Sequence, residues 1–263
     1  MRACLALAVA GIWLGGCTGR GPWSPDTISY RTRFDDPIVL DLTEPVAVDV
    51  ESFGGDVIIV ADAALPWAVV RIMREARHGF LRTQDAIESL IEIDYSVEVA
   101  AGELGPVLKV RTWTTHNEPY FQRAHVRIDL PTADGVKVRT RDGKVYATNV
   151  EGAVDIMTSR GDVRLMTNLP MRRSITIVSE DGSIDYRVRG ESTGVFDCQS
   201  VGGEVAHRVR QGHFVVHIGT DHDTLRATLN GGVNPITLRA TNGDIRIAVV
   251  ANPTDVGTWI ADP

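Results

Sequence analysis

Short runs in which apolar and polar residues alternate recur along most of this chain, separated by turns that contain glycine or proline. Residues 46–50 place valine at every second position, and residues 162–165 alternate Asp and Arg with Val and Leu. A period of two is typical of a β-strand with one buried face. Residues 46–50 and 57–60, joined by Gly54-Gly55-Asp56, form the first predicted strand–turn–strand unit.

From residue 131 onwards the sequence repeats, and each repeat carries a corner glycine, one polar residue and then Val or Ile. The corners are Gly143-Lys144-Val145, Gly161-Asp162-Val163, Gly182-Ser183-Ile184, Gly203-Glu204-Val205 and Gly243-Asp244-Ile245. Successive glycines are 18, 21, 21 and 40 residues apart. We expect the last interval to hold two periods, with the missing corner in Gly219 to Thr224. Other Gly or Pro corners divide each period into two strands.

A repeat of this kind cannot bury its apolar face alone, whereas coils stacked about 4.8 Å apart would share one continuous core. The sequence therefore predicts an all-β fold, a β-solenoid with two strands per coil, with a β-sandwich of hairpins as the alternative. Charges at the corners favour stacking. Asp142, Arg160 and Asp181 precede successive corner glycines, while Lys144 and Asp162 follow them, so neighbouring coils would bring opposite charges together.

Residues 65–130 are less regular. Their pattern predicts a short helix over Thr83 to Leu90 and strands near Leu90 to Val99, Val107 to Thr114 and His125 to Leu130. We expect this segment to contain longer excursions from the repeat.

The first residues have the pattern of a secretory signal. Met1-Arg2 is a positively charged start, Ala3 to Trp13 is apolar, and Leu14-Gly15-Gly16-Cys17 follows. The apolar run is too short to span a bilayer. An ordinary cleaved signal, with Cys17 present only by chance, would account for this pattern.

Leu14-Gly15-Gly16-Cys17 resembles the lipobox of bacterial lipoproteins. The resemblance implies that Cys17 becomes the first mature residue and carries acyl chains such as palmitate, which anchor the protein to a membrane. Thr18, where some lipoproteins have Asp, favours the outer membrane in a Gram-negative cell. We expect a signal peptide over 1–16, a tether rich in Gly, Pro and Ser over 17–27, and a β-repeat domain over 28–263 that is most regular over 131–250.

The charge balance argues against nucleic acid as a partner. The chain has 27 basic and 34 acidic residues, a net charge of −7, whereas a phosphate-binding surface needs a concentrated basic stripe. Arg71 to Arg82 contains four arginines but is interrupted by Glu75 and apolar residues, and we interpret it as a solvated face.

Two motifs suggest catalysis and are assigned to structure instead. Gly190-Glu191-Ser192-Thr193-Gly194 matches a nucleophile elbow, but a predicted strand follows it where a helix is required. Cys198 is the only thiol left after Cys4 is removed with the signal and Cys17 is acylated. It shares a strand face with Phe196, so we expect a small core residue.

Metal binding is considered for His213, His217 and His222, which lie near Asp221 and Asp223. On a strand, His213 and His217 would share the outer face, opposite Phe214, Val216 and Ile218. They would lie roughly 13 Å apart, too far for one ion. We assign no catalytic, cofactor or metal-binding residues.

The runs His125-Val-Arg-Ile-Asp-Leu-Pro131, Val136-Lys-Val-Arg-Thr-Arg-Asp-Gly143 and Thr158-Ser-Arg-Gly161-Asp-Val resemble the β-strand repeats of the "putative adhesin" domains of bacterial envelope proteins, a family of largely unknown function. The resemblance covers about residues 40 to 250. It implies a single-stranded β-helix at the cell envelope, without catalytic residues.

We therefore expect a non-enzymatic binding or structural module, anchored through Cys17, whose partner is an unknown envelope protein or polysaccharide. A carbohydrate-acting β-helix enzyme is the alternative. Tyr146, Tyr186 and the 113–121 loop with Trp113, Tyr120 and Phe121 form a candidate binding surface, although these aromatics would equally suit a core or a cap.

Overall fold

The computed structural model describes residues 29–42, 44–117 and 119–255. The predicted signal peptide over 1–16, Cys17 and the rest of the tether over 17–27 lie outside the described residues. The first sheet contains β1 (Ser29–Phe34), β2 (Ile38–Leu40), β4 (Val57–Ala61), β5 (Ala68–His78), β8 (Gln122–Leu130), β10 (Val145–Thr148), β12 (Val163–Thr167), β14 (Ile184–Val188), β16 (Val205–Val209) and β20 (Ile245–Val249). The second sheet contains β3 (Val46–Ser52), β6 (Ile93–Gly102), β7 (Gly105–Thr114), β9 (Ala133–Asp142), β11 (Glu151–Arg160), β13 (Ile175–Asp181), β15 (Gly194–Ser200), β17 (Phe214–Val216), β18 (Thr224–Leu229) and β19 (Pro235–Asn242).

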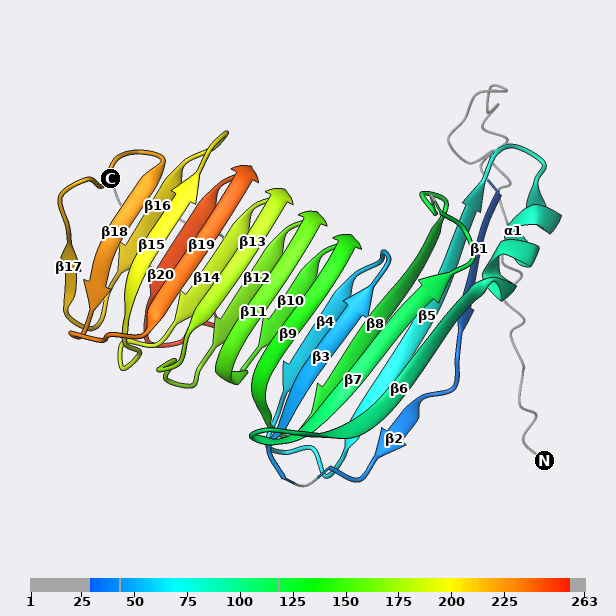
Figure 1. The fold of residues 1–263 in the computed structure, drawn as a ribbon, viewed down its shortest axis with the longest axis horizontal. Helices are drawn as coiled ribbons and strands as arrows, with labels where there is room; N and C mark the ends of the chain where they lie inside the picture. The colour runs from blue at the N-terminus through cyan, green and yellow to red at the C-terminus, as the bar shows by residue number, and fades with distance from the viewer. Residues whose placement is uncertain (1–28, 43, 118, 256–263) are drawn as a thin grey trace, which may run out of the picture.

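The two sheets face each other along an elongated β-solenoid (Figure 1). Each coil gives one strand to each sheet, so β9 and β10 form one coil and β11 and β12 the next. The ladders between these coils are parallel and in register, with Val145 beside Val163 and Val163 beside Ile184. Alternate side chains point inward and are buried, and they form one continuous core between the sheets. The predicted solenoid with two strands per coil is confirmed.

The corner glycines stack in a column, because each leaves room for the backbone of the next coil. Gly161 has a φ of 138°, and a Cβ atom there would overlap the carbonyl group of Gly143. The N–H of Gly161 donates to Asp181 O at 2.8 Å. The expected corner charges also meet: Arg160 lies 3.4 Å from Asp142, and Lys144 lies 3.8 Å from Asp162.

The order of the coils at the C-terminal end differs from the prediction. The coil of β19 and β20 lies between β13/β14 and β15/β16, so the Gly243 corner stacks between Gly182 and Gly203. The interval from 203 to 243 contains β17 and β18, which run antiparallel to their neighbours instead of forming a coil. The corner expected in Gly219 to Thr224 was therefore wrong, because alternation does not reveal whether a strand pairs in parallel or antiparallel.

The N-terminal end has the same kind of exchange. The coil of β3 and β4 lies between β7/β8 and β9/β10, although β3 and β4 come earlier in the chain. The chain segment that follows β4 forms β5, which runs antiparallel to β8, and β6, which runs antiparallel to β7. The helix α1 (Thr83–Ile91), predicted over Thr83 to Leu90, packs beside β1 and β5. These antiparallel strands are the expected excursions.

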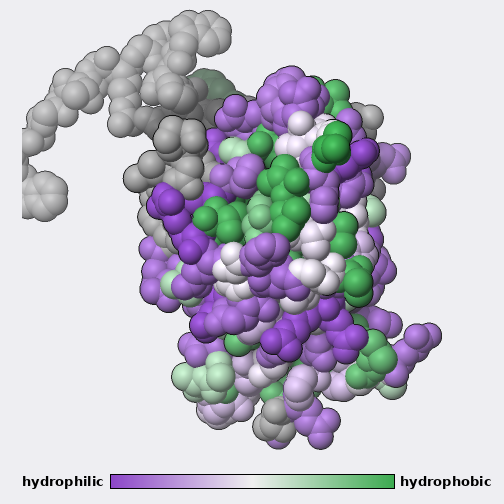
Figure 2. All heavy atoms as spheres, turned by 90° about the vertical axis from the view of Figure 1, so that its left-hand side faces the viewer, coloured by the Kyte–Doolittle hydropathy of each residue, from purple (hydrophilic) through white to green (hydrophobic). Residues whose placement is uncertain are grey.

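The C-terminal end of the solenoid shows a small hydrophobic area among hydrophilic residues (Figure 2). β17 contains only Phe214 to Val216, and of its apolar side chains only Phe214 is partly buried against the core. Val216 is exposed, and Ile218, in the following loop, is fully exposed. The expected buried face over Phe214, Val216 and Ile218 is thus limited to Phe214.

Candidate binding groove

A groove of about 720 Å³ crosses the outer face of the second sheet near the ends of β7, β3, β9, β11 and β13. The register places Glu51, Arg139, Met157 and Val178 side by side on four adjacent strands. Trp113, from β7, also lines the groove, and 44% of its surface is exposed. The groove therefore combines charged and apolar side chains on a rigid ladder.

Two of the groove arginines are fixed by aspartates on a neighbouring strand. Arg111 donates to Asp49 Oδ2 and to Asp49 O, each at 2.9 Å. Arg139 pairs with the Asp155 carboxylate and donates to Asp155 O at 2.9 Å. Each guanidinium group binds both the carboxylate and the backbone carbonyl of one aspartate and is thereby held against the sheet. The charges of these two arginines are therefore already compensated.

Arg141 differs, because it is exposed and forms no ion pair with any residue that the structure describes. It lines both the groove and an adjoining hollow of about 180 Å³. In that hollow Arg160 and Arg123 lie 3.4 and 3.8 Å from Asp142. Two guanidinium groups thus flank one carboxylate and Arg141 lines the same hollow, which makes this corner a local positive site on a chain of net charge −7.

The aromatic residues of the predicted surface have different environments. Tyr120, also on the rim of the small hollow, is 82% exposed, whereas Phe121 packs between His78 and His116 with ring centroids 4.8 and 4.9 Å apart. Tyr186 is completely buried, so its inclusion was wrong; it faces inward between Leu165 and Ile247 of the neighbouring strands.

Tyr146 is partly buried on the outer face of the first sheet, with the guanidinium of Arg164 5.7 Å from its ring centre. Trp113 and Tyr120 are therefore the exposed aromatics of the predicted surface. Phe53, Arg141 and Met157, which also line the groove, were missed. The tetrapeptide Lys-Val-Arg-Thr, which occurs at both 109–112 and 137–140, was the available signal that β7 and β9 have equivalent outer faces.

The acidic residues of the groove are spaced too widely for a glycosidase. Glu51 stands on β3 and Glu180 on β13, with β9 and β11 between them. Three strand spacings put these carboxylates about 14 Å apart, whereas a catalytic pair needs about 5 to 9.5 Å. The arrangement favours binding over glycoside hydrolysis.

A second cluster of titratable groups joins β4, β5 and β8. His125 Nε2 lies 3.3 Å from Glu75 Oε2, and Nδ1 lies 3.5 Å from Asp56 Oδ2. Interaction with Asp56 and then with Glu75 raises the pKa of His125 to about 9. The backbone N–H of Asp56 points at Nδ1 from 3.1 Å and opposes protonation, but two carboxylates outweigh one amide dipole. Glu75 also binds Tyr30 and Arg77, so the cluster ties β1 to the sheet.

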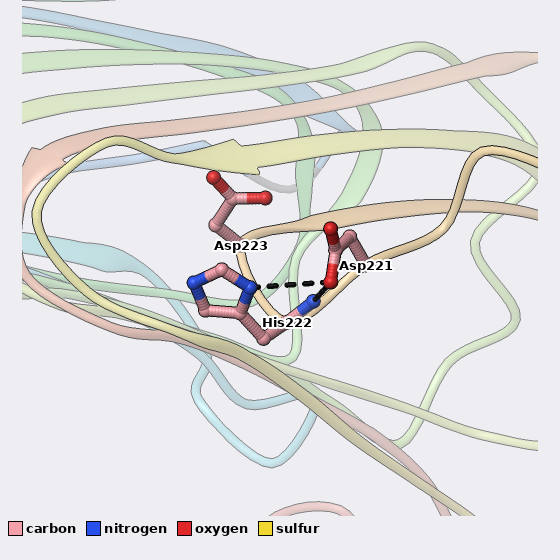
Figure 3. Close-up of side chains that lie close together, drawn as sticks. All are labelled: Asp221, His222 and Asp223. Carbon is pink, nitrogen blue, oxygen red and sulfur yellow. Dashed lines mark hydrogen bonds and ion pairs between the residues drawn. The ribbon is translucent and has the colours of Figure 1, made fainter.

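The histidine-rich segment brings Asp221, His222 and Asp223 together at the surface (Figure 3). Their ligand atoms lie within 4.8 Å of one another, and His222 Nδ1 is 3.2 Å from Asp221 Oδ1. The three residues are consecutive, and Asp221 and His222 are exposed, so the hydrogen bonds within the loop account for the arrangement. His217 instead contacts Thr228 Oγ1 at 2.8 Å.

The other sequence motifs have structural roles. Ser192 is buried in the corner between β14 and β15, where its hydroxyl accepts a hydrogen bond from Met171 N at 3.0 Å. It lacks the exposed position that a nucleophile elbow gives its serine. Cys198 is buried in the core, as predicted, and burial raises the pKa of its thiol to about 12.

The arginines between residues 71 and 82 are individually paired, with Asp129, Asp35, Glu75 and Asp85 as the partners of Arg71, Arg74, Arg77 and Arg82. The interpretation as a solvated face was wrong for Arg74, whose side chain is largely buried and donates to Asp35 at 2.6 and 2.7 Å.

Comparison with known proteins identifies the fold. No curated protein matches the chain. Among solved structures, a "putative cell adhesion protein" from Clostridium sporogenes is 9% identical, with a TM-score of 0.53 over 84% of this chain and 100% of the other. A "putative adhesin" from Bacteroides fragilis is 12% identical over 84% of this chain and 97% of the other, with a TM-score of 0.33.

The Toastrack DUF4097 family matches residues 122–248. This segment begins at the first residue of β8 and ends one residue before the end of β20, so it includes all the coils that stack beyond β3 and β4. The regular part of this chain is therefore a toastrack domain of the DUF4097 family.

Proposed function

We propose that the protein is a lipid-anchored binding module of the cell envelope, held to a membrane through Cys17, with the groove on the second sheet as its ligand site. The observation that carries this proposal is a rigid groove that exposes Trp113 and Arg141 while its acidic residues stand far apart. The name of the Clostridium sporogenes protein agrees with a binding role. Among the described residues, no helix has the length and hydrophobicity needed to cross a bilayer.

Of the two partner classes expected from the sequence, a polysaccharide with carboxylate groups suits the groove better. Exposed aromatic rings such as Trp113 and Tyr120 offer flat apolar faces for sugar rings. Arg141 supplies a planar pair of donors for a carboxylate, without a carboxylate of its own among the described residues.

Binding is tested by calorimetric titration of the purified full chain with polygalacturonate, and with its methyl ester as the uncharged control. Because a hydrogen bond to a charged group contributes about 1.5 to 3 kcal/mol, Arg141→Gln should weaken binding by at least about tenfold. Trp113→Ala should also weaken it. Arg173→Gln removes an exposed arginine outside the groove and should have little effect. Equal binding of both polymers, or equal loss in the two arginine variants, would refute this ligand assignment.

The anchor is tested separately by labelling cells with radioactive palmitate, followed by membrane fractionation of the wild type and Cys17→Ser. We expect label and membrane association in the wild type and neither in the variant. An unlabelled, soluble wild type would refute the lipid anchor and leave a secreted binding domain.

A further inference from the structure

The edge strand β6 is long, and one of its two sides has no neighbouring strand among the described residues. Within the described part of the chain β6 pairs only with β7, although it is ten residues long. The other strands at the ends of the two sheet orders are shorter: β1 has six residues, β16 five and β17 three. Natural edge strands are usually protected by brevity, proline, a bulge or charged side chains, lysine above all. β6 has no proline, lysine or bulge, its charged side chains are both acidic, and its register with β7 is continuous from Ile93 to Gly102.

The backbone groups on the free side can be assigned from the hairpin. Gly102 and Gly105 flank a two-residue turn, so the hydrogen-bonded pairs with β7 fall on Gly102, Ala100 and Glu98. The N–H and C=O groups of Val97 and Val99 therefore point away from β7. Ile93 follows the same alternation, and its carbonyl accepts from Arg74 Nη1 at 2.9 Å. Arg74 covers the start of the strand, and the half from Val97 to Gly102 is open.

The charges in this sheet alternate from strand to strand. β7 and β9 both contain Lys-Val-Arg-Thr, at 109–112 and 137–140, and they flank the acidic strand β3 on its two sides. Asp49 faces a lysine on each neighbour, and Glu51 faces an arginine on each. An acidic strand in this sheet is thus stabilised by basic strands on both sides.

β6 is a second acidic strand and has only one basic neighbour. Glu98 stands opposite Lys109 of β7, is exposed, and forms no ion pair among the described residues. On the inward face Val97 is partly buried, and Val99 remains 43% exposed although its partner Leu108 is completely buried. The open side therefore lacks both a positive charge and an apolar cover.

We propose that β6 binds an extended segment of another protein in which apolar and basic residues alternate, and that this segment adds a strand to the second sheet. Its apolar side chains cover Val99, its basic side chains face Glu98, and its backbone pairs with Val97 and Val99. The Lys-Val-Arg-Thr segments of a second copy of this chain cannot be the added strand, because both are already paired with β3 inside the fold. This inference does not depend on the groove.

The test uses the purified full chain and a fluorescent peptide with the sequence of residues 106–112, Pro-Val-Leu-Lys-Val-Arg-Thr, followed by anisotropy. A second peptide has Glu in place of Lys and Arg. We expect the basic peptide to bind, and the acidic peptide to bind about fivefold to tenfold more weakly, since a cross-strand pair with Glu98 contributes up to about 1 kcal/mol and a like charge in the same place is destabilising.

Glu98→Lys should reverse this preference, so that the acidic peptide becomes the better ligand. The matched control Glu103→Lys makes the same charge change in the exposed turn after β6 and should keep the wild-type preference. Circular dichroism verifies that both variants are folded. Absence of peptide binding, equal binding of both peptides, or equal effects of the two substitutions would overturn the proposal. If the chain associates with itself and this association prevents peptide binding, the proposed partner is wrong and β6 is instead a dimer interface.

Discussion

The column of corner glycines makes a quantitative prediction about Gly161→Ala. Gly161 connects β11 and β12 with a φ of 138°, a region that costs a non-glycine residue about 1 to 3 kcal/mol. A Cβ atom there would also overlap the carbonyl of Gly143. To relieve the overlap, these two coils must separate and weaken the bonds from Gly143 N to Arg160 O and from Val145 N to Asp162 O, now 2.7 and 2.9 Å long.

Each of these hydrogen bonds contributes about 0.5 to 1.5 kcal/mol. Loss of both, added to the backbone strain, predicts that Gly161→Ala lowers the free energy of unfolding by about 2 to 6 kcal/mol. The chain provides a matched control in Gly105, which has a φ of 135° but no neighbouring atom within 4 Å of the position that a Cβ atom would take. Gly105→Ala should therefore show the backbone strain alone.

Urea denaturation followed by circular dichroism measures both variants. We expect Gly161→Ala to be less stable than Gly105→Ala by at least about 1 kcal/mol, the smaller estimate for two weakened hydrogen bonds. Equal losses in the two variants would show that close approach between coils does not explain the glycine column.

Three further predictions concern groups that are buried or partly buried. Because the pKa of His125 is raised to about 9 from an ordinary 6.5, its charge stabilises the fold below about pH 6.5 and this contribution is lost as the pH rises through 9. After allowance for solvent screening of this partly exposed group, His125→Gln should therefore lower the unfolding free energy by about 1 to 2 kcal/mol at pH 6 and much less at pH 10, and a difference independent of pH would contradict the assignment. Tyr186→Phe should raise stability by about 1 kcal/mol, since the buried hydroxyl has no hydrogen-bond partner among the described residues; a loss measured by urea denaturation would contradict this. In a chain with Cys4 and Cys17 replaced by Ser, Cys198 should react with a thiol reagent only on unfolding, and rapid labelling of the folded protein would disprove its burial.

The local pattern was sufficient to predict the solenoid. Val163 and Leu165 alternate with outward residues, and the glycine spacing placed the corners of three consecutive coils at Gly143, Gly161 and Gly182. Local pattern could not order the terminal coils. A strand such as β19 has the same alternation wherever it is inserted, and its place between β13 and β15 is decided by contacts between residues far apart in sequence.

The candidate site was predicted only in part. Trp113 and Tyr120 were included as members of the 113–121 loop and are exposed, whereas Tyr186, which was included with them, is buried. Whether an arginine is available to a ligand depends on its neighbours across the sheet. Arg139 and Arg141 lie on one strand with the same side-chain direction, but only Arg139 has an aspartate beside it.

The exchanged coils also govern how the domain responds to tension. In a solenoid stacked in chain order, force on the C-terminus would peel the outermost coil from an exposed edge, one ladder at a time. Here the C-terminal strand β20 is held between β14 and β16, so pulling on it must break two ladders at once. The same topology means that residues 235–249 must be in place before the coil of β15 and β16 can dock, so this end of the domain is completed last during folding.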